Sequence, residues 1–321
     1  MTLLEVKDLS IVYQTRRGPL RAVEEISFML DKGKTLGFVG ESGCGKSTIG
    51  MALMGLLPPN AAITGGTIHF AGQDLLTLSE DALREVRWQK IAMIFQAAMN
   101  ALNPVHRVAD QVTEAILTHT PGISKASAME RVRELFDLVE IPTKRMTDYP
   151  HQYSGGMKQR AVIAMALACR PDLIIADEPT TALDVIVQAQ ILEEIKTIQK
   201  ELNVGILFIS HDISVVADVC DHIGVMYAGQ LIEYGHRQAV LDSPGHPYTR
   251  RLVGAHQALL GAQRRPQTAP DATPDLVKPP PGCRFCGRCP LVNDTCRKER
   301  PRWQALSADH KIFCCHSDPS G

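Results

Sequence analysis

The chain has 321 residues, enough for one large α/β core and a smaller appendage. Its 34 basic and 35 acidic residues give a formal net charge of −1, so it lacks the positive charge typical of nucleic-acid-binding proteins, and we expect no nucleic-acid partner. Charged residues interrupt the first apolar stretch, and the best later run, Ala161 to Cys169, is about half the length that spans a bilayer. We therefore expect neither a secretory signal nor a membrane span, and a cytoplasmic protein whose membrane role requires partners.

Short apolar runs recur along the chain, with helix-compatible stretches between them. The runs are Leu36–Val39, Ile91–Phe95, Leu173–Ala176, Ile206–Ile209 and Ile223–Tyr227. This alternation predicts a mainly parallel sheet that is buried on both faces. The segment Ser127–Glu140 has Ser127 and Glu130 at capping-box spacing, followed by an apolar stripe. It predicts an amphipathic helix in an insert between two strands of the sheet.

The segment Gly40–Ser47 matches the phosphate-loop pattern G-x-x-x-x-G-K-S, between the run Leu36–Val39 and the helix-compatible stretch Ile49–Leu57. Its glycines permit a tight loop whose amides face phosphate oxygens. Lys46 supplies a positive charge to the β- and γ-phosphates, and the Ser47 hydroxyl can ligate Mg²⁺. The loop predicts binding of ATP with Mg²⁺, with these contacts: Gly40, Ser42, Gly43, Cys44, Gly45, Lys46, Ser47 and Thr48.

Two carboxylates, Asp177 and Glu178, follow the apolar run Leu173–Ala176. An acidic loop after a strand is common. In a protein with a phosphate loop, however, this pair of carboxylates is more specifically interpreted as part of the nucleotide site. Asp177 would bond the hydration shell of Mg²⁺, and Glu178 would polarise the water that attacks the γ-phosphate.

A third motif, Ser154-Gly155-Gly156, precedes the apolar stretch Ala161–Cys169. Ser154 is a favourable N-cap, and the two glycines let the backbone approach a ligand closely. Taken alone, the motif is as consistent with an ordinary helix start as with a ligand-binding role.

The order of these motifs resembles that of the nucleotide-binding subunits of ABC transporters, over about residues 3–255. The resemblance rests on the phosphate loop, Gln96, the Ser-Gly-Gly helix start, Asp177-Glu178, Ala182-Leu183-Asp184 and Ser210-His211-Asp212. It implies an α/β P-loop NTPase of ABC type, with a mainly parallel sheet core, an antiparallel N-terminal β subdomain and a helical subdomain. A small cysteine-rich C-terminal tail would follow.

The resemblance implies a role for each matching residue. Tyr13 would stack on adenine, although an aromatic residue in an alternating strand is often part of a core. Gln96 would sense Mg²⁺ and the attacking water, and His211 would contact the γ-phosphate. Asp184 would cross a dimer interface, and the Ser-Gly-Gly start would serve a nucleotide held by another subunit. The implied catalytic residues are Glu178, His211, Gln96 and Lys46, and those at Mg²⁺ are Ser47, Gln96 and Asp177.

Two further segments, Gln96–Pro104 and His246–Thr249, resemble the dipeptide, oligopeptide and nickel importer branch. This branch implies two membrane permeases, a second, related but different ATPase chain and an extracytoplasmic substrate-binding protein. The chain would then be a peripheral motor on the cytoplasmic face of a bacterial or archaeal membrane. Peptide cargo follows by association only, with nickel or another metal chelate as the alternative. An exporter motor and a soluble ABC ATPase of translation or DNA repair are less favoured.

Six of the nine cysteines lie after residue 282, behind a stretch rich in proline. We therefore expect an ATPase domain over 1–255, a linker over 256–282 and a cysteine-rich region over 283–321. In a cytosolic protein such cysteines indicate metal binding more than disulfides. The branch resemblance implies a [4Fe–4S] cluster that would help to fold the tail, with zinc or no metal as alternatives. The ligands would be Cys283, Cys289, Cys296 and Cys315, although Cys286 and Cys314 leave this choice ambiguous.

Overall fold

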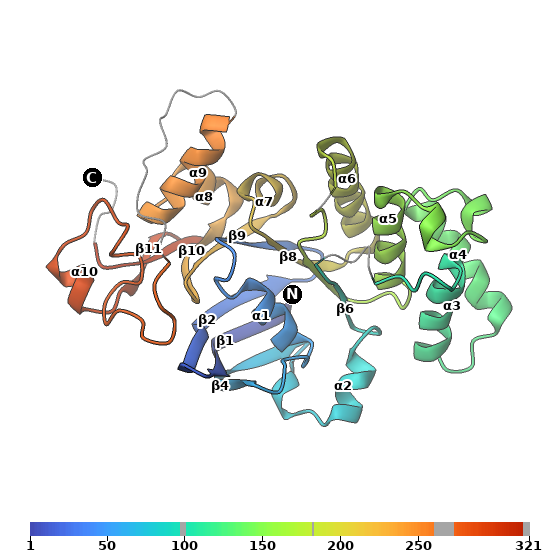
Figure 1. Ribbon diagram of the computed structural model, residues 1–321, viewed down its shortest axis with the longest axis horizontal. Coiled ribbons are helices and arrows are strands. Elements are labelled where there is room, and N and C mark those ends of the chain that lie inside the picture. Colours follow the sequence, from blue (N-terminus) through green and yellow to red (C-terminus); the bar gives the residue numbers. More distant parts are fainter. Residues whose placement is uncertain (97–100, 182, 260–272, 317–321) are drawn as a thin grey trace. The chain divides into compact units, whose positions relative to one another are not determined.

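The computed structural model describes residues 1–96, 101–181, 183–259 and 273–316 (Figure 1). The chain forms two compact units. Unit 1 contains Met1–Leu3, Leu30–Lys34 and Asp74–Phe208, and unit 2 contains Leu4–Met29, Thr35–Gln73 and Ile209–Gly321. The cysteine-rich residues after 282 thus belong to unit 2. No helix in the described ranges is long and apolar enough to cross a lipid bilayer.

Unit 1 combines a short parallel sheet with a group of helices. Its strands are β6 (Ile91–Ile94), β7 (Leu173–Asp177) and most of β8 (Gly205–Ser210), and β6 pairs with β7 in parallel. Its helices are α2 (Glu80–Val86), α3 (Val108–His119), α4 (Lys125–Leu138), α5 (Gly155–Ala166) and α6 (Val185–Leu202). Short 3-10 turns cover Leu75–Thr77, Thr143–Arg145 and Pro150–Gln152. Helices α3, α4 and α5 pack against one another (Figure 1).

Helix α4 confirms the predicted amphipathic helix but corrects its start. Ser124, rather than Ser127, is the N-cap, because Ser124 has an extended backbone and its hydroxyl accepts a hydrogen bond from the Ser127 amide at 3.1 Å. The predicted stripe is fully buried at Val132, Leu135 and Phe136.

Unit 2 contains most of an antiparallel sheet built from the N-terminal strands. Its order is β2-β1-β4-β5, formed by β2 (Gly18–Asp31), β1 (Thr2–Thr15), β4 (Ala61–Phe70) and β5 (Gln73–Asp74). This sheet confirms the expected antiparallel N-terminal β subdomain.

A second set of strands in unit 2 follows the order β11-β12-β10-β9-β3. These are β11 (Arg302–Ser307), β12 (His310–Cys314), β10 (Gln230–His236), β9 (His222–Tyr227) and β3 (Thr35–Val39). Only β3 and β9 pair in parallel, so the sheet is mixed here. The helices are α1 (Lys46–Leu53), α7 (Ile213–Val219), α8 (Arg237–Asp242), α9 (Pro247–Leu259) and α10 (Asp294–Lys298). All five predicted apolar runs are therefore strands.

The C-terminal region folds by joining this sheet. Strand β12 pairs with β10, with Ile312 opposite Glu233, and β11 pairs with β12. Ile312 and Phe285 are buried within unit 2. We expected a tail with too few apolar residues for a core of its own to require a metal cluster. The structure offers another physical reason for its folding, because the tail shares the backbone hydrogen bonds and core of unit 2.

A buried carboxylate connects this hairpin to the start of α9. The Glu233 side chain has no exposed surface and accepts hydrogen bonds from the Gly245 and His246 amides, each at 2.8 Å. It also pairs with His310 Nε2 at 2.6 Å. Burial lowers the pKa of His246 to about 4, so its ring is neutral and its Nδ1 accepts from the Tyr248 amide at 3.1 Å.

Glu233→Gln should lower the free energy of unfolding of unit 2 by about 3 kcal/mol, because one carboxylate oxygen becomes an amide donor that faces other donors. Urea unfolding can be followed through Trp303 of β11 in a Trp88→Phe background, since the chain contains only these two tryptophans. The control is Glu130→Gln, which removes an exposed ion pair with Arg133 and should change stability by less than about 1 kcal/mol. Equal losses of stability for the two substitutions would contradict the stabilising role assigned to the buried Glu233.

Candidate nucleotide site

The phosphate loop connects β3 to α1 and needs glycine at both of its ends. Gly40 has a φ of 157°, and a Cβ there would lie 2.1 Å from the Met226 carbonyl oxygen. Gly45 has a φ of 103°, and its Cβ would lie 2.4 Å from the Ala22 carbonyl oxygen. Two neighbouring strands therefore approach the loop so closely that any side chain at these positions would displace them.

Lys46 is buried against the backbone of the loop. Its Nζ donates to the Gly40 carbonyl at 2.7 Å and to the Glu41 carbonyl at 3.1 Å, and it lies 3.5 Å from Cys44 Sγ. The ammonium group is thus held beside the amides of the loop, where a phosphate oxygen can replace a carbonyl as its partner.

The other predicted nucleotide residues of unit 2 have different surroundings. Ser42, Gly43 and Ser47 are exposed, so a ligand can reach them from solvent. The Tyr13 hydroxyl lies 3.4 Å from the Thr48 hydroxyl, which places this aromatic residue beside the first turn of α1. His211 is exposed after β8, where Asp212 begins α7 by accepting a hydrogen bond from the Ser214 amide.

Unit 1 brings three of its predicted residues to the end of β7. Asp177 is buried at the last position of this strand. Glu178 follows in a left-handed conformation, with a φ of 49°, which is uncommon for a residue with a long side chain and often marks a functional site. Its Oε2 accepts hydrogen bonds from Gln96 Nε2 at 3.0 Å and from the Thr181 hydroxyl at 2.9 Å. Gln96 and Glu178 therefore lie in direct contact.

A second pair of motifs meets at the starts of α5 and α6. Ser154 is the N-cap of α5, as predicted, and accepts a hydrogen bond from the Met157 amide. A Cβ at Gly156 would lie 2.7 Å from Val187 Cγ1 in α6, so the packing of the two helices requires glycine there. Asp184 is the N-cap of α6 and accepts from the Val187 amide at 3.0 Å. Ser154 and Gly155 are exposed beside this contact.

Sequence reasoning missed several residues that bond to the predicted site. Thr181 holds the Glu178 carboxylate, and its position three residues after Glu178 in a turn is the only local signal for this contact. Tyr248 and Arg288 bond to Glu41 of the phosphate loop, and no sequence motif indicates this pairing. Of the predicted motif segments, residues 97–100 and Ala182 lie outside the described residues.

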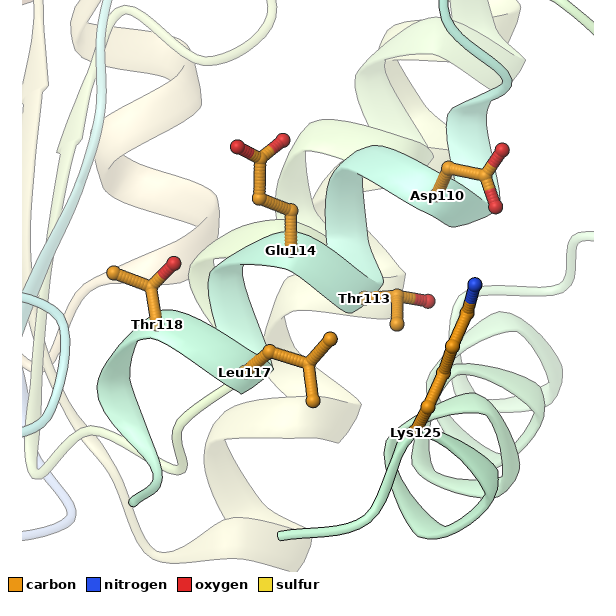
Figure 2. A pocket seen from close by; sticks show the side chains of 6 residues that line it. All are labelled: Asp110, Thr113, Glu114, Leu117, Thr118 and Lys125. Carbon is orange, nitrogen blue, oxygen red and sulfur yellow. The ribbon is translucent and has the colours of Figure 1, made fainter. Parts of the chain in front are cut away.

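A groove of about 400 Å³ lies apart from the predicted residues of unit 1, on the surface of α3 and the start of α4 (Figure 2). Most of the residues that line it are polar or charged by type: Asp110, Thr113, Glu114, Leu117, Thr118 and Lys125. None of the predicted nucleotide residues contributes to it.

The tail cysteines do not form a metal site in the arrangement found. No two of the nine cysteines, all within the described residues, form a disulfide. Across the described part of the chain, no group of three or more His, Cys, Asp or Glu residues is arranged to hold a metal ion. The structure therefore gives no support to the iron–sulfur or the zinc prediction for Cys283, Cys289, Cys296 and Cys315.

Several tail thiols have raised pKa values, because they are buried and lie near other cysteines. Burial raises the pKa of Cys283 to about 12, and burial together with the neighbouring Cys296 and Cys314 raises that of Cys315 to about 12. Cys296 Sγ lies 3.4 Å from His316 Nε2.

Comparison with known proteins identifies the family. The chain is 47% identical over 322 residues to the dipeptide transport ATP-binding protein DppD of Bacillus subtilis, covering 98% of this chain and 95% of that protein. The chain belongs to the ATP-binding subunits of ABC transporters. It is also 47% identical over 301 residues to the oligopeptide transport ATP-binding protein OppD of Salmonella typhimurium, covering 93% of this chain and 89% of that protein. The resemblance seen in the sequence is therefore confirmed.

Family models and solved structures agree with this assignment. The model for "ABC transporter" matches residues 23–181, and that for "Oligopeptide/dipeptide transporter, C-terminal region" matches residues 232–296. A dimeric ATP-binding cassette, MJ0796, in a post-hydrolysis state bound to ADP and phosphate has a TM-score of 0.66 at 26% identity, covering 73% of this chain and 99% of that one. The cbiO1 protein of Clostridium perfringens gives the same TM-score and identity, covering 81% and 98%. This ABC subunit is therefore an ATPase with the predicted P-loop fold.

Cys44 of this ABC subunit should resist alkylation. Burial raises the pKa of its thiol, so the reactive thiolate share is small at pH 7.5 and increases as the pH is raised toward 9. Iodoacetamide labelling followed by peptide mass spectrometry should show modification at least about tenfold slower than at the more exposed Cys286. Equal rates for the two thiols would contradict this account of the loop.

Proposed function

We propose that this ABC subunit is the motor that energises uptake of dipeptides and oligopeptides across the cytoplasmic membrane. The observation that carries the proposal is the identity to peptide transport ATP-binding proteins over nearly the whole chain, including a C-terminal region whose family model is described for oligopeptide and dipeptide transporters. An ATPase does not itself select the cargo, which is the task of a substrate-binding protein and permeases.

The phosphate loop would hold the ATP phosphates through its exposed amides and Lys46. Ser47, Gln96 and Asp177 offer hard oxygen atoms, the donor type that Mg²⁺ prefers, and we assign the ion to them. When bound, Mg²⁺ offsets the negative charge of the phosphates. Tyr13 would stack on adenine from its position beside Thr48.

Glu178 would act as the general base that polarises the attacking water. Its carboxylate is held by Gln96 and Thr181 and stands on a strained backbone, which fixes its direction before substrate binds. Gln96 would couple this base to the state of the membrane partner, because a movement of its loop would break the bond at 3.0 Å. His211 would contact the γ-phosphate.

The Ser154-Gly155-Gly156 start would serve a nucleotide that is bound by a second ATPase subunit. The exposure of Ser154 and Gly155 supports this role, since a partner can reach them. Val185 and Ile186, directly after Asp184, have 82% and 73% of their surface exposed, as expected for apolar residues that a partner covers. The matched cassette MJ0796 is dimeric. We expect a related but different chain in this position.

Two membrane permeases would bind unit 1 near Gln96. Phe95 and Val105, on either side of the undescribed residues 97–100, have 42% and 73% of their surface exposed, which supports a protein contact there. An extracytoplasmic binding protein would deliver the peptide. The motor would be peripheral on the cytoplasmic face of a bacterial or archaeal membrane.

Glu178→Gln should reduce ATP turnover by about 10²-fold or more while keeping ATP binding, because the general base is lost but the phosphate contacts remain. It should also trap an ATP-dependent dimer, measurable by light scattering with the second ATPase present. The matched control is Glu193→Gln, an exposed glutamate paired with Lys196. Unchanged turnover in Glu178→Gln would show that another group is the base.

Co-expression with candidate permease subunits tests the transport role. The chain should co-purify with them, and dipeptides with the binding protein should stimulate ATP hydrolysis in reconstituted vesicles. Stimulation by a nickel chelate but not by peptides would reject the cargo assignment. A stable complex with ribosomes and none with permeases would reject transport itself.

A further inference from the structure

An arginine of the C-terminal region forms a two-bond ion pair with the phosphate loop. Arg288 Nη2 donates to Glu41 Oε1 at 2.8 Å, and Arg288 Nη1 donates to Glu41 Oε2 at 2.9 Å. The Arg288 side chain is 7% exposed and that of Glu41 33% exposed. Glu41 is the second residue of the loop, so the pair holds the loop directly and in one orientation.

The backbone of Glu41 is fixed from two further sides. Its amide donates to the Tyr248 hydroxyl at 3.1 Å, and its carbonyl accepts from Lys46 Nζ at 3.1 Å and from the Cys44 amide at 3.2 Å. Arg288, Tyr248 and Lys46 thus share one loop residue as their partner. A displacement of Glu41 would shift the carbonyl that holds the Lys46 ammonium group.

The turn that carries Arg288 is itself anchored in unit 2. Phe285 is buried and packs edge to face against Tyr227 with ring centroids 5.2 Å apart, and Tyr227 in turn contacts Tyr248 at 4.8 Å. The Phe285 carbonyl accepts from the Arg288 amide at 2.9 Å. The position of Arg288 therefore depends on the folded C-terminal region.

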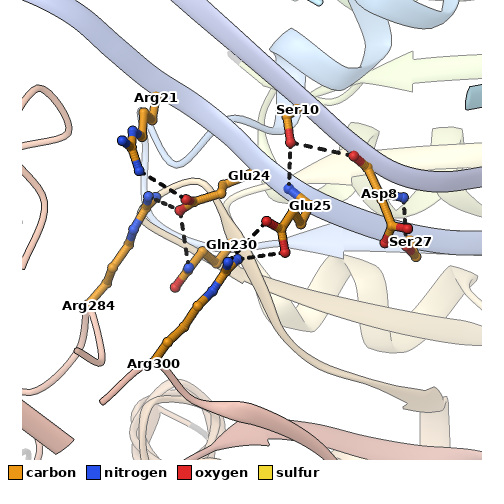
Figure 3. Close-up of polar contacts among 9 residues, drawn as sticks. All are labelled: Asp8, Ser10, Arg21, Glu24, Glu25, Ser27, Gln230, Arg284 and Arg300. Carbon is orange, nitrogen blue, oxygen red and sulfur yellow. Dashed lines mark hydrogen bonds and ion pairs between the residues drawn. The ribbon is translucent and has the colours of Figure 1, made fainter. Parts of the chain in front are cut away.

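Other arginines of the same region bind the strand that approaches the loop at Gly45. Arg284 donates to Glu24 and to the Ala228 carbonyl, and Gln230 joins it at Glu24 (Figure 3). Arg300 pairs with Glu25 at 2.9 Å, in a more exposed position (Figure 3). Both glutamates lie on β2, which also contains Ala22.

The charge of Arg288 matters because its partner Glu41 is a carboxylate in the phosphate loop. A carboxylate at the second position of a loop that receives a triphosphate would repel the ligand if it carried an unpaired charge. Arg288 offsets this charge, because its guanidinium group binds both carboxylate oxygens of Glu41. We propose that Arg288 is a positioning residue for ATP binding, and that the C-terminal region sets the affinity of the phosphate loop through the Arg288–Glu41 pair. This inference rests on the proposed role of the loop in holding ATP.

The test is a titration of the full chain with a fluorescent ATP analogue, mant-ATP, in the presence of Mg²⁺. Arg288→Ala should weaken binding about tenfold, as expected when one charge-assisted pair is lost and its carboxylate is left at the loop. Arg288→Lys, which keeps the charge but not the planar fork, should give a smaller loss. In the assembled transporter the KM for ATP should rise while kcat changes by less than about twofold.

The double variant Glu41→Gln with Arg288→Ala separates a charge effect from a purely structural one. Removal of the carboxylate should restore mant-ATP affinity to within about threefold of the original chain, because the repulsion is gone. If the double variant binds as weakly as Arg288→Ala, or if Arg288→Ala binds as tightly as the original chain, the proposal is wrong.

Two reference variants complete the design. Arg300→Ala removes another ion pair of the same region and should leave affinity unchanged, so an equal loss there would overturn the specific role of Arg288. Lys46→Ala tests the underlying assumption. If Lys46→Ala binds mant-ATP as well as the original chain, the proposed nucleotide site fails. If Lys46→Ala weakens mant-ATP binding but the Arg288 variants do not, the nucleotide site stands and only the positioning role of Arg288 is wrong.

Discussion

The close approach of two strands to the phosphate loop constrains much of unit 2. The carbonyl oxygens of Met226 and Ala22 leave no space for a side chain at Gly40 and Gly45, so β9 and β2 define the path of the loop before any ligand binds. Lys46 then completes the loop by bonding to its carbonyl groups. A loop that is already ordered loses little conformational entropy when a ligand binds, and this favours tight phosphate binding.

The C-terminal region has a structural role in unit 2. It adds β11 and β12 to the sheet beside β10, places Phe285 among the aromatic residues of unit 2 and directs Arg288 to Glu41. The buried Glu233 connects the same hairpin to the start of α9, from which Tyr248 reaches the loop. The C-terminal region thereby links its own stability to the geometry of the nucleotide site.

Most of the fold follows from local sequence patterns. Five apolar runs became strands because each is short, rich in branched residues and followed by a turn or helix start, and the phosphate loop followed from its glycines and Lys46. The start of α4 was misplaced because Ser124 and Ser127 are both good caps, and only the backbone conformation decides between them. The Arg288–Glu41 pair joins residues 247 positions apart, and such long-range pairing leaves no periodic signal in one sequence. The cysteine spacing suggested a cluster, but no group of three or more possible ligands among the described residues is arranged to hold a metal ion.

The proposed function requires that the phosphate loop and the Ser-Gly-Gly helix start act on different nucleotides, so that a single chain would be an incomplete ATPase. The most direct test is ATP turnover per chain measured over a wide range of protein concentration, alone and with the second ATPase subunit added. We predict turnover near zero for the dilute chain alone and a rise to a plateau as the partner is titrated in. A constant turnover per chain at every dilution, unaffected by the partner, would contradict the account.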